Sequence, residues 1–352
     1  TLASWTKNST LPTATISNAP AGTSNTTILN VVIAGSGITE YKYAIGEAAT
    51  TDCATATYNG GAAPGGGILI SSNITDNISV IPDGLVKLCV IGCLNRTWQD
   101  VASASVATWT KQTTPPALVA NGVETLDFNS NGRIDHVKLT FSGSVNDSTF
   151  PGYSLNTLGT AATGWSLGTY TGLAMRHGTS VSTMSSGAYT DTANDNVIYL
   201  SFSENAGLCD VSSQVGCDTG VVPDVTMTVQ ALKDNIGTGN LIALISSGTV
   251  AEKDSAKPVI VGASAPSNIT LSVYFSENVT AATAECGAGS SQSGTNCSTL
   301  YTLDGGLVVT KAVMGSGVGV DSKSAVLTTT TQVDTQPYNL TMAPGIVKDV
   351  NN

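Results

Sequence analysis

Apolar and polar residues alternate with a period of two along much of this chain, and the pattern predicts β-strands. In 134–142 the side chains of Val137, Leu139 and Phe141 fall on one face, with polar residues on the other. This is the pattern of a strand with one face buried and one in water. Comparable segments are 28–33, 35–46, 83–92, 106–109, 196–205, 225–234, 268–278 and 324–330.

Composition supports an all-β protein. Thr, Ser, Gly, Asn, Val and Ala dominate, and no long run of Leu, Glu and Lys follows helical spacing. A length of 352 residues suits two or three domains. We therefore expect tandem Ig-like β-sandwich domains, extended end to end.

Prolines mark the predicted domain boundaries, because proline cannot donate to a strand ladder and stiffens a linker. Thr114-Pro115-Pro116 ends the first block, and Pro258 opens the third. We predict a donor-type strand at 1–12 and Ig-like domains at 13–116, 117–257 and 258–352, and we expect the last one to lack its final strand.

The second and third blocks repeat each other, which indicates a tandem array. KLTFSGSV (138–145) corresponds to SVYFSENV (272–279), and VTMTVQALKD (225–234) to NLTMAPGIVKD (339–349). NVIYLSF (196–202) is matched with SAVLTTT (324–330). After the shared Asp, the second block continues for roughly another strand.

A further repeat links TLASWTKNSTLP (1–12) to ASASVATWTKQTTPP (102–116), the closing strand of the first block. Residues 1–12 carry such a strand with no domain before it. A spare strand and an incomplete last domain predict head-to-tail assembly of identical copies, in which Leu2, Trp5 or their neighbours enter the next subunit. A trimmed fragment of a longer protein would show the same two features.

Charge excludes some partners. The 14 Lys and Arg against 25 Asp and Glu give a net charge of −11, so no basic surface is available for nucleic acid or anionic membranes. The sequence has no apolar run of the length that a membrane span needs.

The seven cysteines predict disulfides and therefore an oxidising, extracellular or cell-surface location. Cys209 with Cys217, and Cys286 with Cys297, would each close a polar loop, and Cys53 would pair with Cys89. Cys93 is then left over. It is free, pairs with Cys53 instead, or bonds another chain.

DFNSNGRID (127–135) is the sharpest local motif. Asp127, Asn129, Asn131 and Asp135 offer oxygen ligands, and Gly132 supplies a tight turn. The order resembles the calcium loop of EF-hands and dockerins, but Leu139 stands where the bidentate Glu belongs. We expect either a calcium ion that rigidifies a domain joint or a metal-free turn.

No residue set predicts catalysis, and we expect no enzyme. His136 is expected on the outward face of a strand and His177 in a loop, both solvated. Glu204 and Glu277 each follow a buried Phe in an FSEN motif, which suggests strand ends in separate domains rather than a glycosidase pair.

The tryptophans have two explanations. Trp5, Trp98, Trp109 and Trp165 could stack on sugars, but Trp5 and Trp109 hold equivalent strand positions, which favours core anchors. Asn-x-Ser/Thr sequons are candidate glycosylation sites only, since this composition produces many by chance. They are Asn8, Asn25, Asn73, Asn77, Asn95, Asn146, Asn268, Asn278, Asn296 and Asn339.

GSGITEYKYAIG (35–46), DGLVKLCVIG (83–92) and ATWTKQTTPP (107–116) resemble modules repeated in large bacterial surface proteins. The second and third blocks, with a proline start and an FSE strand, resemble bacterial Ig-like domains of adhesins and S-layer proteins. The resemblance implies a surface location. It favours a self-assembling fibre subunit, then a segment of a longer adhesin or S-layer protein, and last a carbohydrate-binding module that contacts host or environmental surface glycans.

Overall fold

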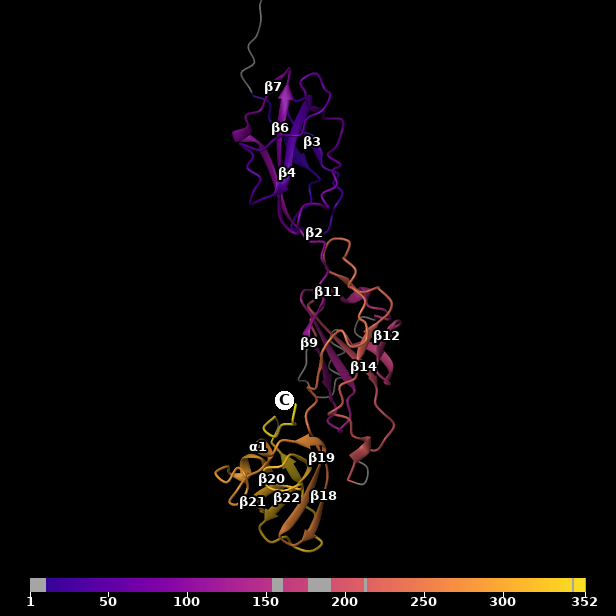
Figure 1. Ribbon diagram of the computed structural model, residues 1–352, viewed down its shortest axis with the longest axis vertical. Helices are drawn as coiled ribbons and strands as arrows, with labels where there is room; N and C mark the ends of the chain where they lie inside the picture. Colours follow the sequence, from indigo (N-terminus) through magenta and orange to yellow (C-terminus); the bar gives the residue numbers. More distant parts are fainter. Residues whose placement is uncertain (1–10, 154–160, 177–190, 212–213, 344, 352) are drawn as a thin grey trace, which may run out of the picture. The chain divides into compact units, whose positions relative to one another are not determined.

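The computed structural model (Figure 1) describes residues 11–153, 161–176, 191–211, 214–343 and 345–351. The chain forms two compact units. Unit 1 comprises 1–115 with 234–240, and unit 2 comprises 116–233 with 241–352.

Unit 1 contains the first sandwich. Its larger sheet has the order β2-β8-β6-β4-β5, with β7 beside β6, and β1 pairs with β3. Along β6, Val86 and Leu88 are buried while Leu85 is exposed, as the expected alternation requires, but from Leu88 to Cys93 both faces of the strand are buried. The strands are β1 (Thr15–Ser17), β2 (Thr23–Ser24), β3 (Val32–Ala34), β4 (Glu40–Glu47), β5 (Ile68–Leu69), β6 (Gly84–Leu94), β7 (Thr97–Trp98) and β8 (Ser105–Lys111).

Unit 2 begins with the second sandwich, whose main sheet has the order β13-β14-β10-β9-β17. β11 pairs with β16, and β12 with β15. Val137, Leu139 and Phe141 of β10 all point into its core. The strands are β9 (Leu118–Leu126), β10 (His136–Phe141), β11 (Val145–Asn146), β12 (Trp165–Leu167), β13 (Thr171–Arg176), β14 (Val197–Ser203), β15 (Val225–Met227), β16 (Lys233–Asp234) and β17 (Glu252–Lys253).

The third sandwich completes unit 2 with a sheet of order β21-β22-β19-β18 and the pair β20-β23. Its separate core is built around Val273 and Phe275 of β19. The elements are β18 (Ile260–Ser267), β19 (Thr270–Val279), the short helix α1 (Ala281–Ala284), β20 (Tyr301–Leu303), β21 (Val309–Met314), β22 (Ser322–Thr329) and β23 (Leu340–Met342).

Strand pairing shows that the second and third sandwiches share one topology. β10 lies between β9 and β14 as β19 lies between β18 and β22, and β12-β15 corresponds to β20-β23. The sequence match of 196–202 with 324–330 was wrong by one residue. Val137 pairs with Leu200 and Leu271 with Leu327, so 196–202 corresponds to 323–329. A one-residue slip exchanges the two faces of a strand, which is why the buried residues settle the register.

The fold is all-β, a tandem array of Ig-like sandwiches. None of the helices in the described ranges is long and apolar enough to cross a membrane.

Candidate strand-binding groove and domain joint

A closing segment, residues 241–253, completes the second sandwich. The Met227 N–H donates to Ile245 O (2.9 Å), and the Ile245 N–H donates back to Met227 O (3.1 Å). The segment then continues as β17, which runs parallel to β9 beside Val123. Ile242 and Ile245 are buried in the core of this sandwich.

The third sandwich holds equivalent residues in the same register but leaves them less buried. Leu167 pairs with Val225 in the second sandwich as Leu303 pairs with Leu340 in the third. Leu167 and Val225 are 0% and 1% exposed, whereas Leu303 and Leu340 are half-buried.

The edge strand shows the same contrast. Val123 pairs with Leu139 as Ala263 pairs with Val273, yet Val123 is fully buried and Ala263 is exposed. In the second sandwich, β17 pairs with β9 beside Val123 and helps to cover it. The exposure of Ala263 is therefore expected if no segment covers the equivalent edge of the third sandwich.

An open groove of about 680 Å³ occupies that place in the third sandwich. Within the described ranges, β18 pairs only with β19, so its outer edge presents unpaired backbone groups. Residues 260–265 of β18 form one wall, and 332–340 form the other. Leu271 and Leu303 contribute apolar surface. Pro266 limits pairing to the first part of β18 because it has no N–H.

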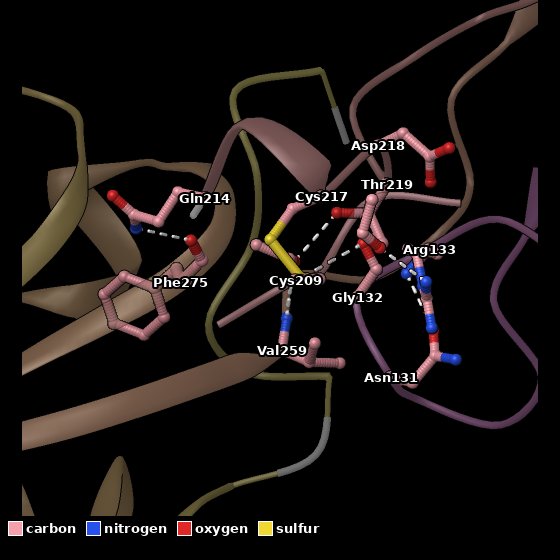
Figure 2. The surroundings of a disulfide bond; sticks show 12 residues. Asn131, Gly132, Arg133, Cys209, Gln214, Cys217, Asp218, Thr219, Val259 and Phe275 are labelled. Atoms are coloured by element: carbon pink, nitrogen blue, oxygen red, sulfur yellow. Dashed lines mark hydrogen bonds between the residues drawn. A yellow bond between two sulfur atoms is a disulfide. The ribbon is translucent and has the colours of Figure 1, made fainter. Parts of the chain in front are cut away.

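The joint between the second and third sandwiches is built from the loop that the Cys209–Cys217 disulfide closes (Figure 2). From this loop the Gln214 side chain donates to the backbone oxygens of Phe275 (2.9 Å) and Lys323 (3.2 Å). Next to it, the Thr219 hydroxyl donates to Ser276 Oγ (2.8 Å). A disulfide in the second sandwich thus fixes contacts to β19.

Three buried carboxyl groups lie at the same joint: Asp254, Glu277 and Asp349. Burial raises the pKa of Glu277 to about 8, and the charge of Asp254 adds to this rise. Burial, together with the charge of Asp349, raises the pKa of Asp254 to about 6. Glu277 was expected at a strand end, but it lies within β19 and belongs to this cluster.

The 127–135 loop lies on the other side of the disulfide loop. Asp127 accepts the N–H groups of Asn131 (3.2 Å) and Gly132 (2.8 Å), and Asp135 accepts that of Phe128 (3.0 Å). Burial raises the pKa of Asp127 to about 6, and the Asp135 charge adds to the shift.

Glu204 joins this loop from the end of β14, away from Glu277. It accepts the side-chain amides of Asn129 (2.7 Å) and Asn131 (2.8 Å) and pairs with Arg133 (2.9 Å). These contacts shape an Asx-type turn. Calcium in this loop stays a prediction.

The structure contains the three expected disulfides, Cys53–Cys89, Cys209–Cys217 and Cys286–Cys297. Cys93 is a buried free thiol, so pairing with Cys53 is wrong. Burial raises the pKa of the Cys93 thiol, which favours its unreactive protonated form.

The solvated position expected for His136 is wrong. The residue is 5% exposed, the centre of its ring lies 4.3 Å from that of Phe128, and its Nδ1 is 2.7 Å from Asp135 Oδ1. His177 lies outside the described residues.

Trp109 and Trp165 are core residues as expected, and Trp98 is half-buried under Lys42 Nζ, which lies 4.6 Å from its ring centre. Trp5, Leu2 and Asn8 lie outside the described residues. Glycosylation stays a prediction. Most sequon asparagines are exposed (Asn73, Asn77, Asn95, Asn268, Asn278, Asn296 and Asn339), while Asn25 and Asn146 are half-buried.

Strand order and the separate cores define the class of this protein, a tandem array of Ig-like β-sandwich domains. Among solved structures it is similar to the FN1–FN3 domains of chicken CNTN1 at 10% identity, over 94% of this chain and 91% of that chain, with a TM-score of 0.23. It is also similar to the N-terminal eight Ig domains of DSCAM isoform 1.30.30 at 11% identity, over 95% of this chain and 36% of that chain, with a TM-score of 0.19. No protein-family model and no curated protein matches the sequence.

Proposed function

We propose that the chain is a structural, non-enzymatic subunit of an extracellular fibre. In this fibre, segment 1–12 of one copy occupies the groove beside β18 of the next copy. The observation that carries the proposal is the open groove of the third sandwich, at the place that residues 241–253 fill in the second. The three disulfides support an extracellular location.

The closing strands of the first two sandwiches suggest how the donor strand lies. β8 runs parallel to β2, and β17 runs parallel to β9. We therefore place the donor strand parallel to β18, along Ala263 and Ser264. Backbone hydrogen bonds would supply affinity, and apolar side chains would supply specificity.

The match of 1–7 with 105–111 assigns the donor side chains. In β8, Trp109 is buried and Val106 is 52% exposed. Trp5 corresponds to Trp109 and Leu2 to Val106. Trp5 is therefore the residue that enters the groove, and Leu2 lies on the outer face.

A complementation experiment tests the assembly. The wild-type chain should polymerise, a chain without residues 1–12 should stay monomeric, and Ala263→Arg should also stay monomeric because the arginine blocks the groove. Mixing these two variants should give a one-to-one dimer, since one retains only the groove and the other only the donor strand. Light scattering and negative-stain microscopy measure both outcomes.

Ala282→Arg is the matched control, because Ala282 is exposed on α1 and does not line the groove. It should polymerise like the wild type. Filaments from Ala263→Arg, or a mixture that stays monomeric, would contradict strand donation.

A second function follows from the repeat itself. Because 1–12 matches the strand that closes the first sandwich, the same residues could close an upstream domain of a longer adhesin or S-layer protein. In that case the chain alone stays monomeric, and the native protein has a larger intact mass.

A further inference from the structure

The carboxyl groups of Asp254, Glu277 and Asp349 come from three separate segments and meet inside unit 2. One oxygen from each lies within 4.8 Å of the others, and their residues are 3%, 4% and 1% exposed. Asp254 follows β17, Glu277 lies in β19, and Asp349 follows β23. The cluster therefore connects the second sandwich to two parts of the third.

Two of these carboxyl groups have an oxygen without a partner. Asp254 Oδ1 and Glu277 Oε1 are fully buried and form no hydrogen bond with any residue that the structure describes. Neither side chain forms an ion pair with lysine or arginine within the described ranges. A buried charge without a partner is costly, so the cluster either holds protons, as the raised pKa values of Glu277 and Asp254 indicate, or binds a cation in their place.

The positions of the second sandwich that correspond to Glu277 and Asp349 form no such cluster. Phe141 corresponds to Phe275 by register, so Gly143 stands in the place of Glu277. Asp234, the counterpart of Asp349, accepts the N–H (2.7 Å) and the side-chain amide (2.8 Å) of Asn240. An aspartate at this position has a local structural role in the second sandwich, whereas the carboxyl group of Glu277 has no counterpart there.

We propose that Asp254, Glu277 and Asp349 bind one calcium ion that ties the second sandwich to the third. Calcium takes oxygen ligands at about 2.3–2.6 Å, so two oxygens on one ion are separated by up to about 5 Å, and all three pairs meet this limit. Three carboxylates also supply enough negative charge for a divalent cation.

Space for water ligands adjoins the cluster on two sides. A cavity of about 190 Å³ is lined by Glu277 and Asn351, and another of about 370 Å³ by Asp349 and Ser255. Asn351 also lies close, with its side-chain amide 3.4 Å from Asp254 Oδ2. These cavities give the ion a path and complete its coordination with water.

Calorimetric titration of the chelator-treated full chain with CaCl₂ tests the site. We expect one calcium per chain and a rise in the melting temperature. Glu277→Gln should bind at least about tenfold more weakly, as expected when a carboxylate that supports a metal site is lost. Without calcium, the same variant should melt no lower than the wild type at pH 7, because a Glu277 carboxyl with a pKa of about 8 is already mostly protonated and glutamine is a neutral group of the same shape.

Glu285→Gln is the matched control, since Glu285 is equally buried in the third sandwich but accepts three backbone N–H groups. It should keep the calcium response of the wild type. If Glu277→Gln fails to fold by circular dichroism, Asp254→Asn replaces it.

Absence of calcium binding by the wild type, or equal binding by Glu277→Gln, would overturn the proposal. Loss of binding in Asp127→Asn with retention in Glu277→Gln would also overturn it, because the ion would then occupy the 127–135 loop. None of the three proposed ligands lies in residues 1–12, so a chain without these residues should bind calcium like the wild type. The calcium test is therefore independent of fibre assembly.

Discussion

The second and third sandwiches have the same strands in the same register but differ in what covers one edge. In the second, residues 241–253 lie across β15 and beside β9, and the residues beneath are fully buried. In the third, the equivalent residues line an open groove. Buried area can therefore differ between two copies of a fold without any change of topology, and here the difference marks the groove to which we assign the donor strand.

The largest loss of stability should come from truncating a buried residue in the segment that closes the second sandwich. Ile242→Ala removes a residue that is 2% exposed, and truncations of this kind cost about 2–5 kcal/mol. Leu303→Ala at the open groove should cost about 1 kcal/mol, because that side chain is only half-buried. Urea denaturation followed by tryptophan fluorescence measures Ile242→Ala, and differential scanning calorimetry measures Leu303→Ala, because residues 258–352 contain no tryptophan. Equal losses would show that the groove is not the distinguishing feature.

The second prediction is that an added peptide can fill the groove of the third sandwich. A peptide of sequence TLASWTKNSTLP, added to the chain without residues 1–12, should stabilise the third sandwich by about 2.7 kcal/mol at 100 times its Kd. The first and second sandwiches should be unaffected. A peptide with Trp5→Asp should have no effect, because Trp5 is the side chain assigned to the groove. Equal stabilisation by both peptides would argue for nonspecific binding.

Strand periodicity predicted much of this fold. The alternation around Val137 and around Val273 identified β10 and β19, because one buried face is enough to specify a strand. Cysteine spacing gave the local disulfides. The repeat between the two blocks led to the prediction of an incomplete third domain, which stays a prediction, and only the structure shows that β17 pairs in parallel with β9.

The joint could not be predicted in the same way. Asp254, Glu277 and Asp349 are far apart in sequence, and no local motif connects them. DFNSNGRID (127–135) predicts a calcium loop because its oxygens are close in sequence, yet backbone amides donate to several of them. His136 was misplaced because polar residues on an alternating strand are usually exposed, whereas Phe128 covers this one.

The third prediction compares two disulfides. Removing Cys209–Cys217 or Cys286–Cys297 by double substitution to serine should cost about 2–3 kcal/mol in each case, since both loops are short. Only the first should also separate the unfolding of the second and third sandwiches, because its loop carries Gln214 to Phe275. Differential scanning calorimetry should resolve an additional transition for that variant. If both variants unfold in the same single transition, Gln214 does not couple the second sandwich to the third.

The smallest effect tests whether the third sandwich is simply a looser copy of the second. Glu285 accepts the N–H groups of Ser291 (2.7 Å), Met314 (2.9 Å) and Gly319 (2.9 Å). Burial opposes its charge, but these hydrogen bonds outweigh burial and hold the pKa of Glu285 below its ordinary value. The unfolded state therefore binds more protons, and this contribution to stability is present above about pH 4.5 and is lost as the pH falls.

Glu285→Gln should cost about 1–2 kcal/mol at pH 7, and the difference from the wild type should shrink towards pH 3.5. Urea denaturation at both pH values measures it, with Glu47→Gln as an exposed control. A loosely packed sandwich would let water replace these hydrogen bonds, and the substitution would then have little effect at either pH. A cost that appears at pH 7 and fades in acid would show that the third sandwich is tightly built around Glu285 and that its openness is confined to the groove.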